Sequence, residues 1–290
     1  MSLAQTIADP RSAQRRPASA SVIIPAHNEA AVIERTLRPL ARAAAAGELE
    51  VIVVCNGCHD ETAAVAASVP GVIVIETEIA SKPHALNLGD ARASAWPRVY
   101  LDADIVADES SVRGVALWLS LNDGFAARPT AEYELGSASW PVRAYYRARS
   151  RVPSLHEAMW GAGIYALSHA AHERLGSFPE VVGDDLWVDR LFDPDEKAIV
   201  TGAPVIVQTP RTLAALLAVT RRAVRGAAAA GPSGRSASTT GGTLSGIARS
   251  VRGPATAFDA AVYLAVALLA RASRASLGAK RGWERDDSSR

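Results

Sequence analysis

The chain has 290 residues, which is enough for one large domain or two smaller ones with a substantial core. Its 31 Lys and Arg residues nearly balance its 30 Asp and Glu residues, so the overall charge gives no argument for nucleic acid binding. The first twenty residues are polar and do not resemble a signal peptide, and we expect residues 1–20 to form a disordered lead.

Short apolar runs alternate with helical segments along the first hundred residues. Residues 21–25, 51–55, 72–76 and 99–101 predict four buried strands. Strands that alternate with helices imply right-handed crossovers and a mainly parallel sheet with helices on both faces. Ligands bind such sheets at the carboxyl ends of the strands, where each polar turn of this region falls. The sequence has neither a glycine-rich dinucleotide loop after the first strand nor a P-loop motif.

The turns after the first two predicted strands are polar. Asn28 is placed to cap a helix predicted over residues 30–37, and the Glu29 carboxylate would favour the dipole of that helix. Cys55 and Cys58 form a C-x-x-C pair, a spacing that also occurs in redox and zinc sites. No second cysteine pair completes a zinc cage, so we interpret the two cysteines as part of a turn.

Asp102 and Asp104 follow the fourth predicted strand and are separated by one alanine. Side chains alternate along a strand, so both carboxylates are expected to point the same way. Hard cations such as Mg²⁺ and Mn²⁺ prefer oxygen ligands and commonly join one or two carboxylates to substrate phosphates. The pair therefore predicts a metal site for a phosphorylated substrate, with a solvated turn as the alternative for so short a motif.

The C-terminal part of the chain is simpler in composition. Residues 231–246 are rich in Gly, Ser and Thr, which predicts a flexible segment rather than a helix or strand. Residues 260–270 form an uncharged apolar run that is shorter than the roughly 20 residues of a membrane-spanning helix. We expect this run to pack on the body of the protein, with contact to a membrane surface as the alternative.

Four segments in series resemble the motifs of the family 2 glycosyltransferases, namely residues 21–29 (SVIIPAHNE), 56–62 (NGCHDET), 82–89 (KPHALNLG) and 102–104 (DAD). The ordered series is more specific than any one motif, and the resemblance covers residues 21–210. Members of that family have the GT-A fold and use nucleotide-diphosphate sugars as donors. The resemblance implies the same fold and the same donor class for this chain.

The resemblance also implies roles for particular residues. Asn56 stands where the family usually has an aspartate that helps to recognise the base, which leaves the base open. Asp60 and Thr62 are expected to hold the second turn in shape. The residues implied to bind the donor are Pro25, Ala26, Asn28, Glu29, Asn56, Lys82, Asp102, Ala103 and Asp104, and Asp104 with Asp102 would also hold Mn²⁺ or Mg²⁺.

A second acidic motif, Asp184 and Asp185, stands at the start of a predicted helix. Acids at a helix start are often only caps, but the resemblance makes these two the candidates for the general base that deprotonates the acceptor. Neighbouring residues on a helix point about 100° apart, so only one of them can face the acceptor well. Their spacing to Arg190 favours Asp184, whereas reading them as the family's Glu-Asp pair favours Asp185, and both stay candidates.

Three further stretches could contact substrates. Residues 136–152 mix aromatic side chains with arginines, which suits an acceptor surface, or equally a helix with an aromatic core side and a basic solvated side. By resemblance, residues 160–163 (WGAG) would lie beside the donor sugar, where glycine permits close approach. Four arginines could bind a departing diphosphate or could form the solvated face of a helix; they are Arg211, Arg221, Arg222 and Arg225.

These observations predict an α/β protein of the GT-A fold, with a Rossmann-like, mainly parallel central sheet flanked by helices and a C-terminal helical extension. Residues 21–125 would bind the nucleotide sugar, and residues 126–230 would hold the acceptor and the base. Residues 231–253 would form a flexible loop, and residues 254–290 a helix and a polar tail.

The predicted function is metal-dependent, inverting transfer of a sugar to the hydroxyl of a saccharide or lipid-linked acceptor, for envelope polysaccharide or glycolipid synthesis. We expect the protein in the cytoplasm, with peripheral contact to the inner face of the cell membrane allowed but no transmembrane span. Two alternatives are a non-catalytic nucleotide-sugar-binding or scaffold protein and a sugar-phosphate nucleotidylyltransferase. The latter normally carries a glycine-rich basic loop where this chain has residues 26–29 (AHNE).

Overall fold

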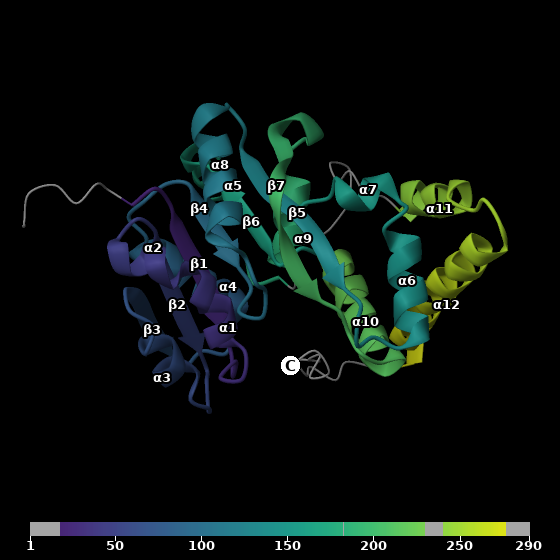
Figure 1. The fold of residues 1–290 in the computed structure, drawn as a ribbon, viewed down its shortest axis with the longest axis horizontal. Coiled ribbons are helices and arrows are strands. Elements are labelled where there is room, and N and C mark those ends of the chain that lie inside the picture. The colour runs from purple at the N-terminus through teal and green to yellow at the C-terminus, as the bar shows by residue number, and fades with distance from the viewer. Residues whose placement is uncertain (1–17, 182, 230–239, 277–290) are drawn as a thin grey trace, which may run out of the picture.

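The computed structural model describes residues 18–181, 183–229 and 240–276. Most of the expected N-terminal lead, residues 230–239 of the expected loop and the polar tail from residue 277 lie outside this part of the chain. Within it, seven strands form one sheet in the order β3-β2-β1-β4-β6-β5-β7 (Figure 1). Strand β6 is antiparallel to both of its neighbours, and the other neighbouring strands are parallel. The strands are β1 (Ser21–Ala26), β2 (Glu50–Asn56), β3 (Val72–Thr77), β4 (Arg98–Leu101), β5 (Ala126–Glu134), β6 (Ile164–Leu167) and β7 (Lys197–Gln208).

Helices connect and flank these strands. Those along the sheet are α1 (Ile33–Leu37), α2 (Ala41–Ala46), α3 (Thr62–Ala67), α4 (Lys82–Arg92), α5 (Glu109–Leu121), α8 (His169–Leu175) and α9 (Asp184–Leu191). A second group forms the extension at the right of Figure 1: α6 (Trp140–Arg149), α7 (Pro153–His156), α10 (Leu213–Ala229), α11 (Thr240–Arg249) and α12 (Pro254–Ser276).

The core lies on both faces of the sheet because successive side chains of a strand point to opposite sides. On β1, Val22 and Ile24 pack in one cluster with Ile33 of α1. Ile23 points to the other face and packs with Leu86 of α4. All five side chains are completely buried. The predicted α/β fold with a mainly parallel sheet and a C-terminal helix is therefore confirmed.

The predicted helix cap at Asn28 is wrong. Helix α1 begins at Ile33, and its N-cap residue Val32 makes no side-chain capping bond. Asn28 instead has a left-handed backbone with φ of 51°, and its Oδ1 accepts a hydrogen bond from the His59 backbone N–H at 2.6 Å. The side chain thus fastens the turn after β1 to the turn after β2.

The expected flexible segment also needs correction, because helix α11 occupies part of it. The Gly, Ser and Thr content of this helix gives a low intrinsic helix propensity, so packing must stabilise it. Ile247 is buried in a cluster with Val152, and a Cβ at Gly246 would lie 2.8 Å from Val152 Cγ1. The glycines that suggested a loop therefore allow close packing of a helix.

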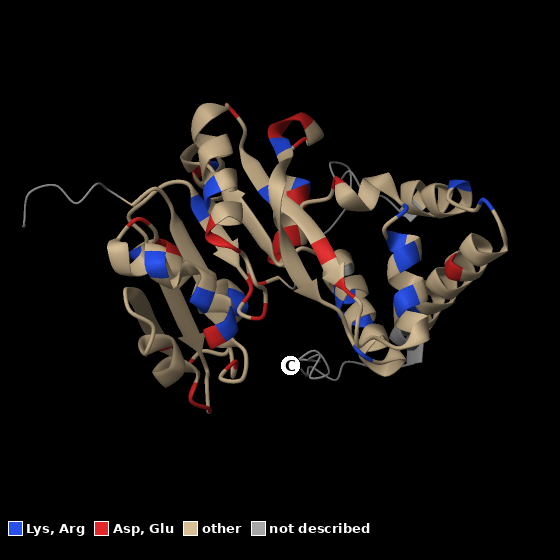
Figure 2. Cartoon of the chain, in the orientation of Figure 1, with Lys and Arg blue, Asp and Glu red and all other residues tan. Residues whose placement is uncertain are grey.

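Helix α12 packs on α6 through rings and charges. Tyr263 stacks on Tyr145 with their ring centroids 4.9 Å apart. Asp259 is buried and accepts hydrogen bonds from Arg147 at 2.7 and 3.1 Å and from Arg151 at 2.8 Å. Figure 2 shows these basic turns of α6 beside the acidic turn of α12. Residues 136–152 thus have an aromatic core side, but two of their arginines pair with α12.

One helix of the described residues is long and apolar enough to cross a membrane, by length and composition alone. The candidate span is Pro254–Ala272, 19 residues that extend well beyond the uncharged run. The uncharged run is therefore part of a longer helix, and the expectation of no transmembrane span stays a prediction. A single such helix is weak support for a span, since the packed helix of a globular domain passes the same test.

Candidate active site

Lys82 joins two acidic segments at the carboxyl edge of the sheet. It is the first residue of α4, whose start is capped by Ser81 Oγ, the acceptor of a hydrogen bond from the His84 backbone N–H. The Lys82 Nζ lies 2.6 Å from Asp102 Oδ1, just after β4, and 2.7 Å from Asp184 Oδ1, at the start of α9. One ammonium group therefore links the motif predicted to bind the donor to the motif predicted to supply the base.

Burial and charge act in opposite directions on this group of side chains. Burial alone would lower the pKa of Lys82, but the carboxylates of Asp102, Asp184 and Asp185 raise it above its ordinary value. Burial raises the pKa of Asp102 to about 6, although the Lys82 charge opposes this shift. Lys82 therefore stays charged at neutral pH and offsets the repulsion between the carboxylates around it.

Asp102 and Asp104 lie in a turn and not on a strand. Strand β4 ends at Leu101, and the Ile105 backbone N–H donates to the Asp102 carbonyl at 3.1 Å. Strand alternation therefore does not set their directions, which corrects the expected reason for their proximity. Ala103 between them is buried, and its carbonyl accepts a hydrogen bond from Thr36 Oγ1 at 2.7 Å, which anchors the turn to α1.

The acidic turn fits a metal ion that is shared with a ligand. No hydrogen bond or ion pair holds the Asp104 carboxylate within the described part of the chain, while Asp102 Oδ1 is paired with Lys82. The same residues contain no group of three or more His, Cys, Asp or Glu side chains that could hold a metal. Mg²⁺ and Mn²⁺ often take one or two carboxylates and complete their shell with phosphate oxygens and water. The donor set suits that arrangement and not a site closed by protein ligands alone.

The two acids of α9 differ in exposure and in partners. Asp184 is 5% exposed, and its oxygens are occupied by Lys82 and by Tyr165, whose hydroxyl donates at 2.9 Å. Asp185 is partly exposed and accepts a hydrogen bond from the Gly161 backbone N–H at 2.8 Å. Burial, and next the charge of Asp184, raise the pKa of Asp185. Asp185 is therefore the acid that a ligand can reach.

The segment before α9 is held by the third motif. Asn87 Oδ1 accepts a hydrogen bond from the Phe178 backbone N–H at 2.8 Å, and Asn87 Nδ2 donates to the Phe178 carbonyl at 3.0 Å. Ser81 Oγ donates to Glu180 Oε2 at 2.9 Å. These contacts, like the Tyr165 bond to Asp184, were missed by sequence reasoning, because 91 residues separate Asn87 from Phe178. They fix the position of both acids relative to Lys82.

The glycine loop before β6 lies against the acidic turn. Gly163 has φ of 66°, and a Cβ there would lie 2.4 Å from Ile105 Cγ1 and 3.2 Å from Asp102 Oδ2. Its carbonyl accepts a hydrogen bond from the Asp102 backbone N–H at 2.8 Å. Only glycine meets both the backbone and the space requirement, and the loop reaches the acidic site as expected.

The predicted nucleoside side is formed by the turns after β1 and β2. Pro25, Ala26 and Asn56 are buried at the strand ends, whereas Asn28 and Glu29 are partly exposed. His27, which sequence reasoning did not single out, lies with Nδ1 2.5 Å from the Asn56 carbonyl oxygen. Strands β1 and β4 are neighbours in the sheet and run parallel, so these turns and the acidic turn share one edge.

The second turn is braced by Asp60 and Thr62, as expected. Asp60 accepts hydrogen bonds from the backbone N–H groups of Thr62 and Ala30, each at 3.1 Å. Burial raises the pKa of Cys55 to about 12, so its thiol is not a nucleophile at neutral pH. Cys58 Sγ donates to the Ala26 carbonyl at 3.4 Å. Both cysteines are thus integrated into the strand end and its turn.

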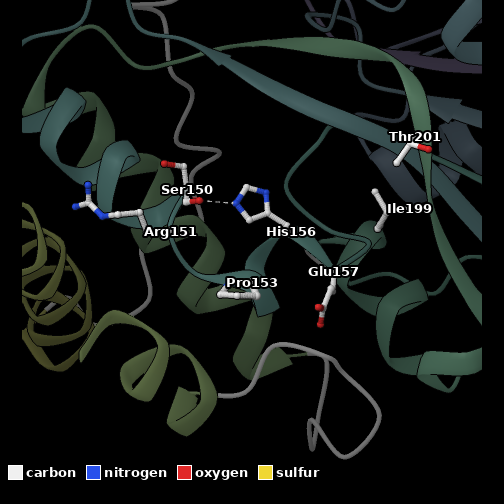
Figure 3. A pocket seen from close by; sticks show the side chains of 7 residues that line it. All are labelled: Ser150, Arg151, Pro153, His156, Glu157, Ile199 and Thr201. Atoms are coloured by element: carbon white, nitrogen blue, oxygen red, sulfur yellow. Dashed lines mark hydrogen bonds between the residues drawn. The ribbon is translucent and has the colours of Figure 1, made fainter. Parts of the chain in front are cut away.

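Two other regions lie apart from this edge. Arg211 precedes α10 and is separated by about four helical turns from Arg225, so the four predicted arginines do not form one cluster. A hollow of about 430 Å³ lies between the α6–α7 segment and β7 (Figure 3). Its lining contains none of the residues predicted to bind the donor or to act as the base, but it includes Ser150 and Arg151 of the predicted acceptor stretch. Its His156 ring faces the Ser150 carbonyl, with Nε2 at 2.8 Å.

The sheet and its acidic edge are those of a GT-A glycosyltransferase. Among solved structures, a mannosyltransferase from Pyrobaculum calidifontis is 21% identical with a TM-score of 0.56, and the match covers 91% of this chain and 77% of that one. Glucosyl-3-phosphoglycerate synthase from Mycobacterium tuberculosis is 24% identical with a TM-score of 0.51, over 71% of this chain and 76% of that one. TarS from S. aureus is 14% identical with a TM-score of 0.52, over 90% and 75%. At these identities the likeness shows the shared fold.

Residues 21–159 match the model of glycosyl transferase family 2. Residues 21–159 therefore form a family 2 glycosyltransferase region, and the resemblance of the four motifs, which all lie within it, is confirmed at the level of the family. No curated protein sequence matches the chain.

Proposed function

We propose that this glycosyltransferase is metal-dependent and moves a sugar from a nucleotide-diphosphate sugar to a hydroxyl acceptor. The observation that carries the proposal is the Lys82 bridge, which places the acidic turn and the α9 acids around one charge. Two solved structures of the same fold support the donor class, since one is a complex with GDP-Man and Mn²⁺ and the other a complex with UDP-Glc and Mn²⁺. The two bases differ, so we assign neither base to this chain.

The proposed chemistry is a single displacement. The acceptor oxygen forms a bond to the anomeric carbon while Asp185 takes the acceptor proton. The bond between that carbon and the diphosphate oxygen breaks, and its electron pair leaves with the nucleoside diphosphate. Asp104 and Asp102 would hold a divalent ion, which would supply Lewis-acid stabilisation of the charge on this leaving group. Lys82 adds a fixed positive charge beside the same turn, and Asp184 holds Lys82 in place.

A single displacement inverts the configuration at the anomeric carbon. We therefore expect the product to carry the linkage opposite to that of the donor. Nuclear magnetic resonance of the product formed with an accepted hydroxyl compound measures this configuration directly. A product with the donor's configuration would exclude direct attack by the acceptor.

Metal dependence can be tested at Asp104, whose carboxylate is not engaged by the protein. We expect Mn²⁺ to increase the thermal shift produced by UDP-glucose or GDP-mannose in the wild-type chain. We expect Asp104→Asn to abolish that increase and to lower turnover about 10²-fold or more, because charge on the leaving group loses its counter-ion.

Asp108→Asn is the matched control for this test, since Asp108 is an exposed acid four residues further along the chain. It should retain the Mn²⁺ effect in full. Donor binding that ignores Mn²⁺ in the wild-type chain would contradict the metal site. Tight donor binding without turnover on any acceptor would favour a non-catalytic binding protein.

A further inference from the structure

Arg149, in the last turn of α6, is a buried cation that the described protein does not neutralise. The residue is 9% exposed. Its Nε and Nη2 both donate to Tyr133 Oη, each at 3.4 Å, which is beyond the usual length of such a bond. Its guanidinium lies 5.0 Å from the Trp160 ring centroid. No carboxylate or carbonyl lies within hydrogen-bond distance of it among the described residues.

Three other arginines nearby each have a carboxylate or carbonyl acceptor, which Arg149 lacks, although Arg151 Nε is itself buried without a hydrogen-bond partner among the described residues. Arg147 and Arg151, two residues to either side, pair with Asp259 on the far side of the helix. Arg128 is also buried, but it donates to the carbonyls of Ala158, Pro129 and His156 at 2.7 to 2.8 Å. Burying a guanidinium without such partners costs several kcal/mol, and aromatic contacts offset about 2 kcal/mol of it at most.

A second unused donor lies at the same place. The indole Nε1 of Trp160 is buried and has no hydrogen-bond partner among the described residues. Arg149 has only the two long bonds to Tyr133, and Trp160 Nε1 has none, so an acceptor group from outside the chain would improve the hydrogen bonding of both side chains. Because one of the donors is charged, an anionic group would complete the site better than a neutral one.

Arg149 lies close to the candidate base Asp185, because both residues lie against Gly161. A Cβ on Gly161 would lie 2.9 Å from Arg149 Nη2, and the Gly161 backbone N–H donates to Asp185 Oδ2. Tyr133 Oη donates to the carbonyl of the same glycine at 3.2 Å. Arg149 is therefore separated from Asp185 by one backbone segment.

We propose that Arg149, with Trp160, binds an anionic group of the acceptor, a phosphate or a carboxylate. This inference rests on the proposed function, which makes the Asp185 side of the site the acceptor side. The donor's phosphates are accounted for at Lys82 and the acidic turn. A negatively charged acceptor would place its anion on Arg149 and its hydroxyl near Asp185.

The test is titration of the full-length protein with inorganic phosphate and with acetate at constant ionic strength, followed by thermal shift and calorimetry. We expect one of the two anions to bind, phosphate if the acceptor group is a phosphate and acetate if it is a carboxylate. Arg149→Met should weaken that binding about tenfold or more, because a charged hydrogen bond is lost. Arg143→Met, an exposed arginine of the same helix, should bind as the wild-type chain does.

Stability separates a binding role from a structural one. Without ligand, Arg149→Met should keep or raise the melting temperature, because it removes an unpaired buried charge. Arg128→Met should lower it by about 10 °C, since three carbonyls lose their donor. A fall in melting temperature in Arg149→Met as large as that in Arg128→Met would overturn the proposal.

Binding of neither anion by the wild-type chain, or equal binding by Arg149→Met, would overturn it as well. Titration of the same preparations with UDP-glucose and GDP-mannose in Mn²⁺ separates the two proposals. If the donor binds and no anion does, only this inference fails. If no donor binds, the proposed function fails, whatever the anion result.

Discussion

Replacing Asp185 by Asn is expected to lower kcat by about 10³-fold while donor affinity changes little, because general base catalysis contributes about 10² to 10⁴. The carboxylate accepts the backbone N–H groups of Gly161 and Leu186, and the amide oxygen can accept only one of them, so a modest loss of stability should accompany the loss of turnover. Steady-state kinetics with the accepted hydroxyl compound, together with donor titration, measure the two effects separately.

Asp184→Asn is the informative control. Both oxygens of Asp184 are engaged by Lys82 and Tyr165, so its loss should lower stability and donor affinity as well as turnover. If Asp184→Asn instead reduced kcat alone and Asp185→Asn disturbed donor binding, the roles assigned to the two acids would have to be exchanged.

The pH profile gives an independent check of the same base. A base must be deprotonated to act, so kcat/KM should fall as the pH drops through the pKa of Asp185. That pKa is raised by burial and then by Asp184, so the acid limb should lie above the range of an ordinary aspartate. The limb should be absent from the residual activity of Asp185→Asn.

Replacing Lys82 by Met is expected to destabilise the protein by about 3 kcal/mol and to weaken donor binding. The substitution leaves Asp102 and Asp184 close together without their cation, and breaking a buried pair costs about 3 to 5 kcal/mol. We place the value at the lower end because the Asp102 side chain is 40% exposed and water screens it. Urea denaturation and donor titration at neutral pH measure both losses.

The pH dependence of the Lys82→Met defect has a definite sign. Burial already raises the folded-state pKa of Asp102, and loss of the Lys82 charge, which opposes that shift, raises this pKa further. The resulting penalty is therefore full at neutral pH and disappears as the pH falls and Asp102 takes up a proton. A defect that stays constant into the acid range would show that Lys82 acts through packing.

Lys197→Met provides a matched buried pair away from the donor side. Lys197 Nζ lies 3.1 Å from Asp189 Oδ1, and both side chains are almost fully buried. This variant should lose stability as well, with donor affinity unchanged. Equal loss of donor affinity in both variants would mean that destabilisation alone explains the Lys82 result.

Much of the fold could be predicted because the strands are apolar runs that end at polar turns. Because parallel strands end together, the order of motifs placed the acidic turn at the same edge as the turns after β1 and β2. The acids of α9 follow an antiparallel strand, and only the family resemblance linked them to the site. The sequence pattern could not show which residue joins them to the acidic turn. The bridge of Lys82 depends on how α4, β4 and α9 meet, and local spacing does not encode that.

The misses have a common cause in tertiary packing. Helix α11 contradicts its own composition because Ile247 is buried against Val152 and the nearby glycine allows the approach. The arginines of residues 136–152 look alike in the sequence, yet Arg147 and Arg151 pair with Asp259 and Arg149 does not. The difference comes from a carboxylate more than a hundred residues away.

That carboxylate also constrains what α12 can do. If α12 left α6 and entered a lipid bilayer, Asp259 would move into hydrocarbon, and Arg147 and Arg151 would lose their ion-pair partner. Both changes are energetically unfavourable. The exposed Leu268 and Leu269 lie on the outer side of the seated helix and can touch an apolar surface without those changes. The ion pairs of Asp259 thus allow α12 to contact a membrane surface but oppose its insertion into the bilayer.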